Sequence, residues 1–190
     1  GEPFDIYRNG TKLNETPLTN KGTFFIDKQP LKGAITYEVR GGGINGSYTM
    51  KEDAPVGYIP IPLTKPASGN TPDGRYYTYT ASDASIGDVD GDGNYEIFLK
   101  WEPTNAADNS RAGFTGNVYI DCYRLTGERL WRIDLGKNIR AGAHYTQFLV
   151  ADFDSNGKAE MIVRTSDGAR DGLGKVIGDS TADYRENAGA

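Results

Sequence analysis

The sequence has only one cysteine and one histidine among its 190 residues, and both scarcities restrict what the chain can be. A single cysteine cannot form an internal disulfide, and one cysteine with one histidine cannot supply the four ligands of a structural zinc site. Cys122 alternates with Val118 and Ile120, so we expect it to be a small buried apolar residue on a strand. The fold must therefore be stabilised without a zinc ion or an internal disulfide.

Clustered positive charge and long apolar runs are missing as well. The net charge is −5 and no group of lysines and arginines forms a phosphate-binding stripe, so we expect no nucleic-acid partner. No stretch approaches the ~20 apolar residues of a membrane-spanning helix, so we expect no membrane partner. The chain begins at Gly1 without methionine, which is typical of a mature or trimmed product.

What the sequence has instead is an acidic loop that occurs twice, at residues 88–96 (DVDGDGNYE) and 152–160 (DFDSNGKAE). Both copies carry oxygen-bearing side chains at positions 1, 3, 5 and 9 and glycine at position 6, a spacing typical of loops that bind Ca²⁺. Position 7 can contribute only its backbone carbonyl, which is why a lysine is tolerated there. The predicted ligands are Asp88, Asp90, Asp92, Asn94 and Glu96 in the first loop and Asp152, Asp154, Asn156, Lys158 and Glu160 in the second.

The loops have two alternative interpretations besides a Ca²⁺ site between strands. An EF-hand has flanking helices and a glutamate at position 12, but position 12 here is Leu99 or Val163, inside the apolar runs 96–100 and 160–164. A plain Asp/Gly hairpin turn without a metal is the second alternative. Because each loop joins two apolar segments, the sequence favours a strand, a Ca²⁺-binding turn and a further strand.

The remaining chain predicts an all-β fold in three regions. Residues 1–52 look like an incomplete fibronectin type III-like sandwich with a hairpin turn at Asn9–Gly10. Residues 53–75 contain five prolines and predict an extended connector. In the first region, β-branched and aromatic residues predict strands at Phe4–Tyr7, Thr23–Ile26 and Ile35–Val39.

Residues 76–190 predict part of a β-propeller. A meander of four strands, which is one propeller blade, is predicted at Asp83–Val89, Tyr95–Trp101, Asn117–Leu125 and Arg129–Leu135. A second copy begins with strands on either side of the second acidic loop. A propeller needs typically four to eight blades, so we expect this region to be the first blade and the start of the second, within a larger protein.

Hairpin geometry predicts a second functional region. Each acidic loop fixes one end of a blade, so the start of the first strand and the end of the second meet at the opposite end, at the mouth of the central channel. The predicted substrate-binding residues there are Asp83, Glu102, Arg140 and His144. Local capping, pairing or packing is the alternative for each of them, and Lys100 and Arg164 are expected to be salt-bridge partners.

The sequence resembles the rhamnogalacturonan lyases of polysaccharide lyase family 11. The resembling segments are 79–93, 99–101, 130–148 and 167–178, and the segment 130–148 (LWRIDLGKNIRAGAHYTQF) is the most specific. The resemblance implies that the chain is the N-terminal portion of an enzyme with an eight-bladed, Ca²⁺-binding propeller, monomeric at full length. High external Ca²⁺ favours a secreted or cell-surface location. Ser155 and Asn156 depart from the more usual Gly-Asp, which weakens the second site slightly because Asn156 is a neutral ligand.

The activity that the resemblance implies is β-elimination at the rhamnose–galacturonate bond of pectin rhamnogalacturonan I. This chemistry has to neutralise the uronate carboxylate, remove the C5 proton and assist the leaving C4 oxygen; a cation can serve the first need and a basic side chain the second. The resemblance implies that the base lies in later blades, beyond residue 190. The expected partners are the pectic polysaccharide and the remainder of the propeller. A non-catalytic Ca²⁺-binding propeller for carbohydrate binding or adhesion is the alternative, and a purely structural scaffold is a third.

Overall fold

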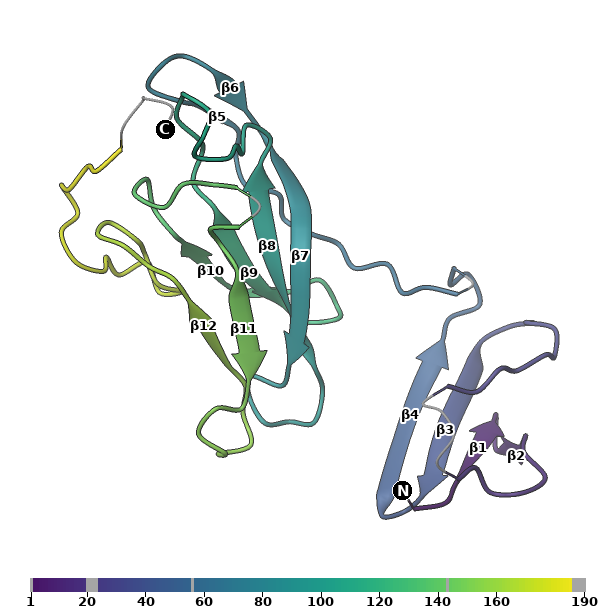
Figure 1. The fold of residues 1–190 in the computed structure, drawn as a ribbon. Coiled ribbons are helices and arrows are strands. Elements are labelled where there is room, and N and C mark those ends of the chain that lie inside the picture. Colours follow the sequence, from purple (N-terminus) through teal and green to yellow (C-terminus); the bar gives the residue numbers. More distant parts are fainter. Residues whose placement is uncertain (1, 20–23, 56, 143, 186–190) are drawn as a thin grey trace. The chain divides into compact units, whose positions relative to one another are not determined.

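The computed structural model describes residues 2–19, 24–55, 57–142 and 144–185, and it confirms the all-β prediction. These residues form strands, turns and irregular segments, and no helix among them is long and apolar enough to cross a membrane. The chain divides into two compact units, Gly1–Pro60 and Ile61–Ala190 (Figure 1). Each unit builds its own antiparallel sheet.

The first unit contains one four-stranded sheet in the order β2-β1-β3-β4. The predicted Asn-Gly hairpin is confirmed: Asn9 has a φ of 46° and Gly10 a φ of 79°, the left-handed conformations that a type I′ turn requires. The sheet has no second layer of strands among the described residues of this unit. Its strands are β1 (Phe4–Arg8), β2 (Thr11–Lys12), β3 (Ile35–Gly41) and β4 (Ile44–Met50).

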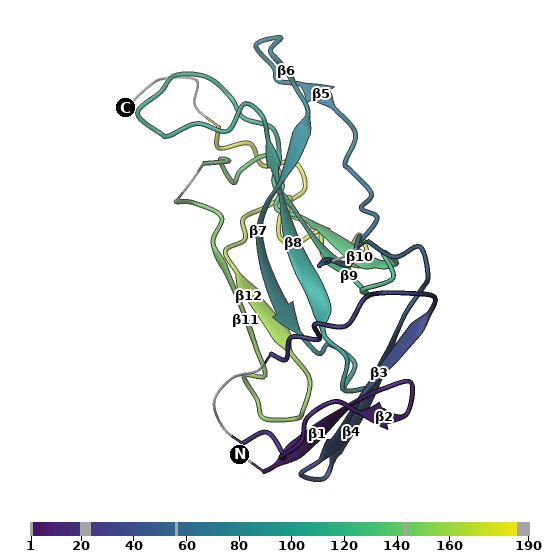
Figure 2. The ribbon, with the colours of Figure 1, turned by 90° about the vertical axis from the view of Figure 1, so that its right-hand side faces the viewer.

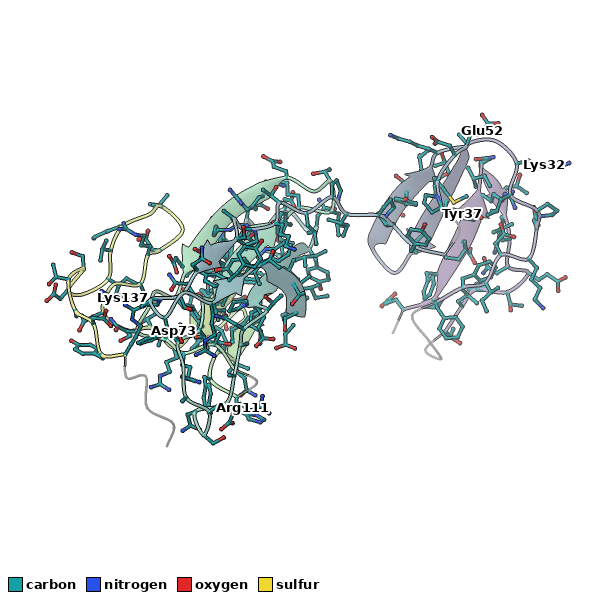
Figure 3. The ribbon with its side chains drawn as sticks, turned by 90° about the horizontal axis from the view of Figure 1, so that it is seen from above. Lys32, Tyr37, Glu52, Asp73, Arg111 and Lys137 are labelled. Carbon is teal, nitrogen blue, oxygen red and sulfur yellow. The ribbon has the colours of Figure 1, made fainter. Side chains whose placement is uncertain are left out.

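The strand predicted at Thr23–Ile26 is wrong for residues 24–26, which lie outside any strand, while Thr23 lies outside the described residues. The segment is held by the neighbouring Asp27 instead of by a ladder. The Asp27 carboxylate accepts hydrogen bonds from Nη1 of Arg8 at 2.7 Å and from the hydroxyl of Tyr37, labelled in Figure 3, at 2.8 Å. Composition alone favours a strand here, but these side-chain bonds fix the segment without strand pairing.

The second unit is built on a four-stranded antiparallel meander in the order β10-β9-β8-β7. All four predicted strands are present, and the first of them begins earlier than predicted, at Tyr79. A short ribbon of β5 (Gly69–Asn70) and β6 (Tyr76–Tyr77) precedes the meander. The meander consists of β7 (Tyr79–Gly87), β8 (Glu96–Pro103), β9 (Tyr119–Tyr123) and β10 (Arg129–Asp134).

A second hairpin packs against this meander. It pairs β11 (Phe148–Ala151) with β12 (Glu160–Val163), and β11 lies beside β7 in Figures 1 and 2. Gly87 at the end of β7 permits the contact, because a Cβ at this position would lie 2.6 Å from Cβ of Ala159 and 2.7 Å from Cγ1 of Val150. The N–H of Ala159 donates to the carbonyl oxygen of Asp88 at 2.6 Å. The two acidic loops are therefore neighbours.

Apolar side chains fill both faces of the meander, because alternate residues of a strand point to opposite faces. Side chains of the second hairpin complete one core, and Tyr79, Leu99, Trp101 and Tyr123 form the other. Cys122 is fully buried, as predicted, and burial raises the pKa of its thiol to about 12. The first core contains Val118, Ile120, Leu135, Ile139 and Ala141, covered by Phe148, Met161 and Val163.

A buried carboxylate fixes the connector to the meander. Asp121 is fully buried and accepts hydrogen bonds from Nε1 of Trp101 at 2.8 Å, from the hydroxyl of Tyr123 at 2.6 Å and from Nε of Arg132 at 2.6 Å. Arg132 also donates from Nη2 to the carbonyl oxygen of Thr64 at 2.6 Å. A buried charge is tolerated when it is paired and its remaining acceptor positions are bonded, as they are here.

The close approach at Gly87 predicts that Gly87→Ala destabilises the second unit. The added methyl group would overlap Ala159 and Val150, and overpacking of this kind costs about 1–3 kcal/mol. Thermal and urea unfolding of the purified protein measure the change. Gly46→Ala on β4 is the matched control, because a Cβ at Gly46 meets no atom within 4 Å. Equal melting temperatures for the two variants would contradict the close packing of the second hairpin on β7.

Candidate functional site

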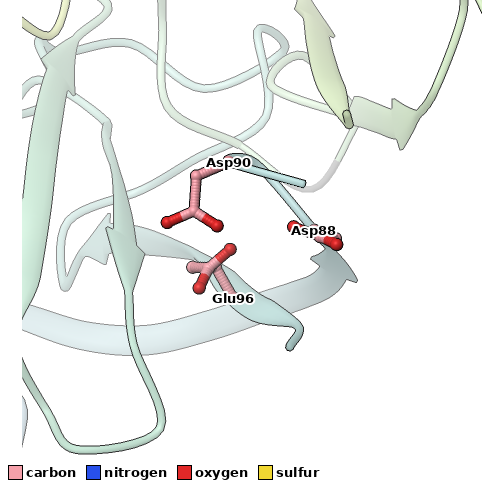
Figure 4. Close-up of side chains that lie close together, drawn as sticks. All are labelled: Asp88, Asp90 and Glu96. Carbon is pink, nitrogen blue, oxygen red and sulfur yellow. The ribbon is translucent and has the colours of Figure 1, made fainter. Parts of the chain in front are cut away.

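The first acidic loop gathers its carboxylates at one end of the β7–β8 hairpin. One carboxylate oxygen from each of Asp88, Asp90 and Glu96 lies within 4.8 Å of the other two. Figure 4 shows the three side chains close together. Asp88 follows β7 directly and Glu96 begins β8, so strand pairing sets the spacing between them. Gly93 has a φ of 87°, a left-handed conformation that glycine adopts without a steric cost.

Backbone N–H groups hold the first loop in this shape. Asp88 accepts hydrogen bonds from the N–H groups of Gly91 at 2.7 Å and Gly93 at 2.8 Å, and these bonds, that of Gly93 first, lower the pKa of the Asp88 carboxyl. Glu96 is buried and accepts a hydrogen bond from the N–H of Val89 at 3.0 Å. A carboxylate has about four acceptor positions, so both side chains keep oxygen lone pairs for a cation.

The second acidic loop repeats this arrangement at the end of the β11–β12 hairpin. Oxygen atoms of Asp152, Asp154 and Glu160 lie within 4.8 Å of one another. Asp152 accepts the N–H of Gly157 at 2.8 Å and Glu160 accepts the N–H of Phe153 at 2.9 Å. The same two bonds occur at the same positions of the first loop, so the repeat in sequence is a repeat in geometry.

One difference between the loops is visible in the backbone. Ser155 has a φ of 61°, whereas Gly91, at the same position of the first loop, has a φ of 78°. A left-handed conformation costs a residue with a side chain roughly 1–2 kcal/mol. The second loop therefore retains the turn at a higher conformational cost than the first.

Two other predicted ligands, Asp92 and Asn156, are not among the clustered side chains. The Asp92 carboxylate accepts the N–H of Asn94 at 2.7 Å, and the Asn156 side-chain oxygen accepts the N–H of Lys158 at 2.8 Å, so both side chains bond within their own turns. Three of the predicted side chains in each loop thus converge, and acidic groups at this spacing could hold a metal ion. The donors are carboxylate oxygens, which suit hard cations such as Mg²⁺ and Ca²⁺.

Arg124 is a cation beside the first loop that the sequence did not reveal. Its Nη2 lies 2.9 Å from Asp90, and its Nη1 lies 3.9 Å from Glu96. Among the described residues, no lysine, arginine or histidine forms an ion pair with the carboxylates of the second loop. Arg124 therefore pairs with carboxylates of the first loop, whereas those of the second loop have no ion-pair partner among the described residues.

The predicted substrate-binding residues Asp83 and Glu102 lie at the opposite end of the same hairpin. Pairing between β7 and β8 shifts register between Ala81 and Ala84, and this irregularity places Asp83 in an ion pair with Lys100. The Lys100 side chain is 2% exposed and that of Asp83 is 69% exposed, so Asp83 neutralises a buried cation. Glu102 is half-buried and accepts a hydrogen bond from the hydroxyl of Ser82 at 3.4 Å.

The other two predicted substrate-binding residues, Arg140 and His144, precede β11. The Arg140 guanidinium donates to four backbone carbonyls, and these bonds fix the loop between β8 and β9. His144 is exposed. The Arg140 acceptors are the carbonyl oxygens of Ala107 at 3.0 Å, Gly113 at 2.8 Å, Asp108 at 3.1 Å and Arg111, labelled in Figure 3, at 2.8 Å.

A pocket of about 260 Å³ lies at this end of the second unit. Tyr145, which the sequence did not single out, bonds through its hydroxyl to the side-chain oxygen of Asn109 at 2.8 Å and so joins the loop to the segment before β11. Of the four predicted substrate-binding residues, only Arg140 lines the pocket. The lining consists of Asn109, Asn138, Ile139, Arg140, Tyr145 and Arg164.

Comparison with known proteins assigns the chain to a family. Residues 58–190 match the family model described as the C-terminal domain of rhamnogalacturonan lyase family 11. The chain belongs to rhamnogalacturonan lyase family 11. The resemblance stated from the segment 130–148 is thereby confirmed.

Relatives with names support the same assignment. The chain is 55% identical over 190 residues to the rhamnogalacturonan endolyase YesW of Bacillus subtilis, covering 98% of this chain and 30% of that protein. It is 47% identical over 189 residues to the rhamnogalacturonan exolyase YesX of the same organism, covering 98% of this chain and 31% of that protein. The crystal structure of YesW superimposes with a TM-score of 0.80 at 53% identity, over 97% of this chain and 32% of that chain. The family 11 chain thus spans about 30% of the length of the curated relatives it matches.

The position of Arg124 predicts that Arg124→Gln changes the two loops unequally. Without metal, the first loop loses the ion pair with Asp90 and its carboxylates repel one another more strongly. With metal, a nearby positive charge has been removed, so the first loop should bind Ca²⁺ severalfold more tightly, because like charges repel. Titration calorimetry measures the affinities of the two loops.

Lys12→Gln provides a control for the loss of a paired cation, since Lys12 bonds to Asp5 in the first unit at 3.0 Å. It should leave Ca²⁺ binding unchanged. Identical binding isotherms for Arg124→Gln and the unmodified protein would show that Arg124 does not act on the loop.

Proposed function

We propose that this chain is part of a Ca²⁺-dependent rhamnogalacturonan lyase, which cleaves the rhamnose–galacturonate backbone of rhamnogalacturonan I by β-elimination. The observation that carries the proposal is membership of family 11, together with relatives named as a rhamnogalacturonan endolyase and exolyase at 55% and 47% identity. The proposed partners are the pectic polysaccharide and the rest of a monomeric propeller. A secreted or cell-surface location is part of the same proposal.

The proposed architecture has a fibronectin type III-like region at 1–52, a connector at 53–75 and propeller blades at 76–190. Support for the blades comes from the meander order β10-β9-β8-β7 and from a second hairpin that packs beside β7 with the same acidic loop. Support for the sandwich is weaker, since the first unit has a single sheet among its described residues.

Ca²⁺ is the proposed cofactor of both acidic loops. Its support is the set of carboxylate oxygens at each loop, the left-handed turn at Gly93 and the lack of nitrogen or sulfur donors among the clustered side chains. Asp88, Asp90 and Glu96 would hold one ion, and Asp152, Asp154 and Glu160 the other. Bound there, the ions would neutralise carboxylates at the ends of two hairpins and stabilise the fold.

The residues at the other end of the hairpins are proposed to face the substrate. Asp83 and Glu102 present carboxylate oxygens that can accept hydrogen bonds from sugar hydroxyl groups, and His144, four residues after Arg140, is exposed. The group that removes the C5 proton is proposed to lie outside these 190 residues. The part of the site within this chain therefore binds and orients the polysaccharide.

The test of the activity uses the complete protein, rhamnogalacturonan I and Ca²⁺. β-Elimination creates a carbon–carbon double bond in the product, so ultraviolet absorbance should rise with time and unsaturated oligosaccharides should accumulate. Homogalacturonan of equal concentration serves as the control substrate and should give no product. Calorimetric binding of rhamnogalacturonan I without unsaturated product would instead support the non-catalytic carbohydrate-binding alternative.

The metal proposal predicts that chelation lowers the melting temperature. A ligand that binds only the folded state stabilises it by about 2.7 kcal/mol when its concentration is 100 times the dissociation constant. Asp88→Ala and Asp152→Ala should each reduce the difference between melting curves recorded with Ca²⁺ and with chelator. Asp53→Ala, at an exposed position outside the loops, should leave the difference intact. Superimposable curves with and without chelator in the unmodified protein would refute the sites.

A further inference from the structure

The two copies of the acidic hairpin place a basic residue at the same position. Lys100 and Arg164 are each the thirteenth residue counted from the first aspartate of their loops; Lys100 lies within β8 and Arg164 directly follows β12. In the first copy, Lys100 is 2% exposed and paired with Asp83. The residue at the position of Asp83 in the second copy is Gln147, which is neutral.

Arg164 is accordingly a cation without a carboxylate. Its side chain is exposed, and among the described residues it takes part in no ion pair and in no side-chain hydrogen bond. One difference from the first copy is the glutamine at position 147, directly before β11, where the first copy has Asp83. The second copy thus keeps the positive charge and omits the group that neutralises it.

Arg164 lines the pocket of about 260 Å³, and two other polar residues of the lining, Arg140 and Asn138, already bond to the protein. Arg140 uses its donors on the loop carbonyls. The Asn138 amide donates to the carbonyls of Asp167 at 2.8 Å and Ala182 at 3.0 Å and accepts the N–H of Tyr184 at 2.8 Å. Arg164 is therefore the lining cation whose donors are open to a ligand.

The chemistry of the pocket suits a carboxylate. Two guanidinium groups give it positive charge, and an arginine fork matches the two oxygens of a carboxylate. Asp108, beside the pocket, is held by the N–H of Ser110 at 3.0 Å and the hydroxyl of Tyr145 at 3.1 Å, and so does not occupy Arg164. The volume is below the ~300–1,000 Å³ of pockets that enclose whole drug-sized ligands, which suits one acidic sugar unit.

We propose that Arg164 binds the carboxylate of a galacturonate unit of the polysaccharide, and that Arg140 acts behind it by positioning the loop that closes the pocket. This inference rests on the proposed function, which supplies the acidic polysaccharide. It assigns Arg164 a binding role in place of the salt-bridge role expected from the sequence.

Arg164→Gln and Arg164→Lys in the complete protein test the assignment. Binding is measured by calorimetry with rhamnogalacturonan I oligosaccharides and with the same oligosaccharides after their carboxyl groups have been reduced to alcohols. The glutamine variant should bind the native oligosaccharides about tenfold more weakly, as expected for a lost hydrogen bond to a charged group. The lysine variant should recover part of the loss, and the reduced oligosaccharides should not distinguish the variants.

Lys175→Gln is the matched control, since Lys175 is exposed on a loop of the same unit and does not line the pocket. Melting temperatures of all variants should agree, because Arg164 has no partner to lose among the described residues. If the unmodified protein cleaves rhamnogalacturonan I and Arg164→Gln binds it as well as Lys175→Gln does, the pocket assignment is wrong and the lyase proposal stands. If the unmodified protein neither binds nor cleaves rhamnogalacturonan I, the proposed function fails, and the assignment fails with it.

Discussion

A carboxylate that is buried away from water needs hydrogen-bond donors or a cation beside it, and this requirement organises both the fold and the candidate site. In the meander, Asp121 accepts hydrogen bonds from Trp101, Tyr123 and Arg132. Arg132 also donates to the carbonyl oxygen of Thr64 and so fixes the connector. At the loop, Glu96 accepts a hydrogen bond from the N–H of Val89. The acidic residues are thus part of the framework that positions the strands as well as candidate ligands.

The same requirement explains why the acidic loops keep their shape. Backbone N–H groups satisfy Asp88 and Asp152 from within each loop, so the turn that brings the carboxylates together is also the turn that supplies their donors. The loops are further connected to each other by the hydrogen bond from Ala159 to Asp88, which the missing side chain at Gly87 permits. The geometry of one loop is therefore not independent of the hairpin that carries the other.

Much of this could be predicted from the sequence, because the features are local. The acidic spacing, the Asn9–Gly10 turn and the alternating strands of the meander each depend on residues close together in the chain. What failed or was missed depends on residues far apart. The segment at residues 24–26 is held through Asp27 by Arg8 and Tyr37, and Arg124 reaches the first loop only because β9 pairs with β8. No periodicity in the sequence encodes such contacts.

The internal repeat offers a further guide, because it separates what the fold requires from what a site requires. Positions that both copies share, such as the first and ninth residues of the loops, make the same backbone hydrogen bonds and are needed to build the hairpin. Positions at which the copies differ are free of that constraint.

At one end the first copy has Arg124 beside its carboxylates, and at the other it has Asp83 beside Lys100. The second copy has neither counter-ion among the described residues, so a single backbone frame leaves negative charge open at one end and positive charge open at the other. Ligands of opposite sign, a metal cation and an acidic sugar, can therefore be bound by the two ends of one hairpin without a change of fold.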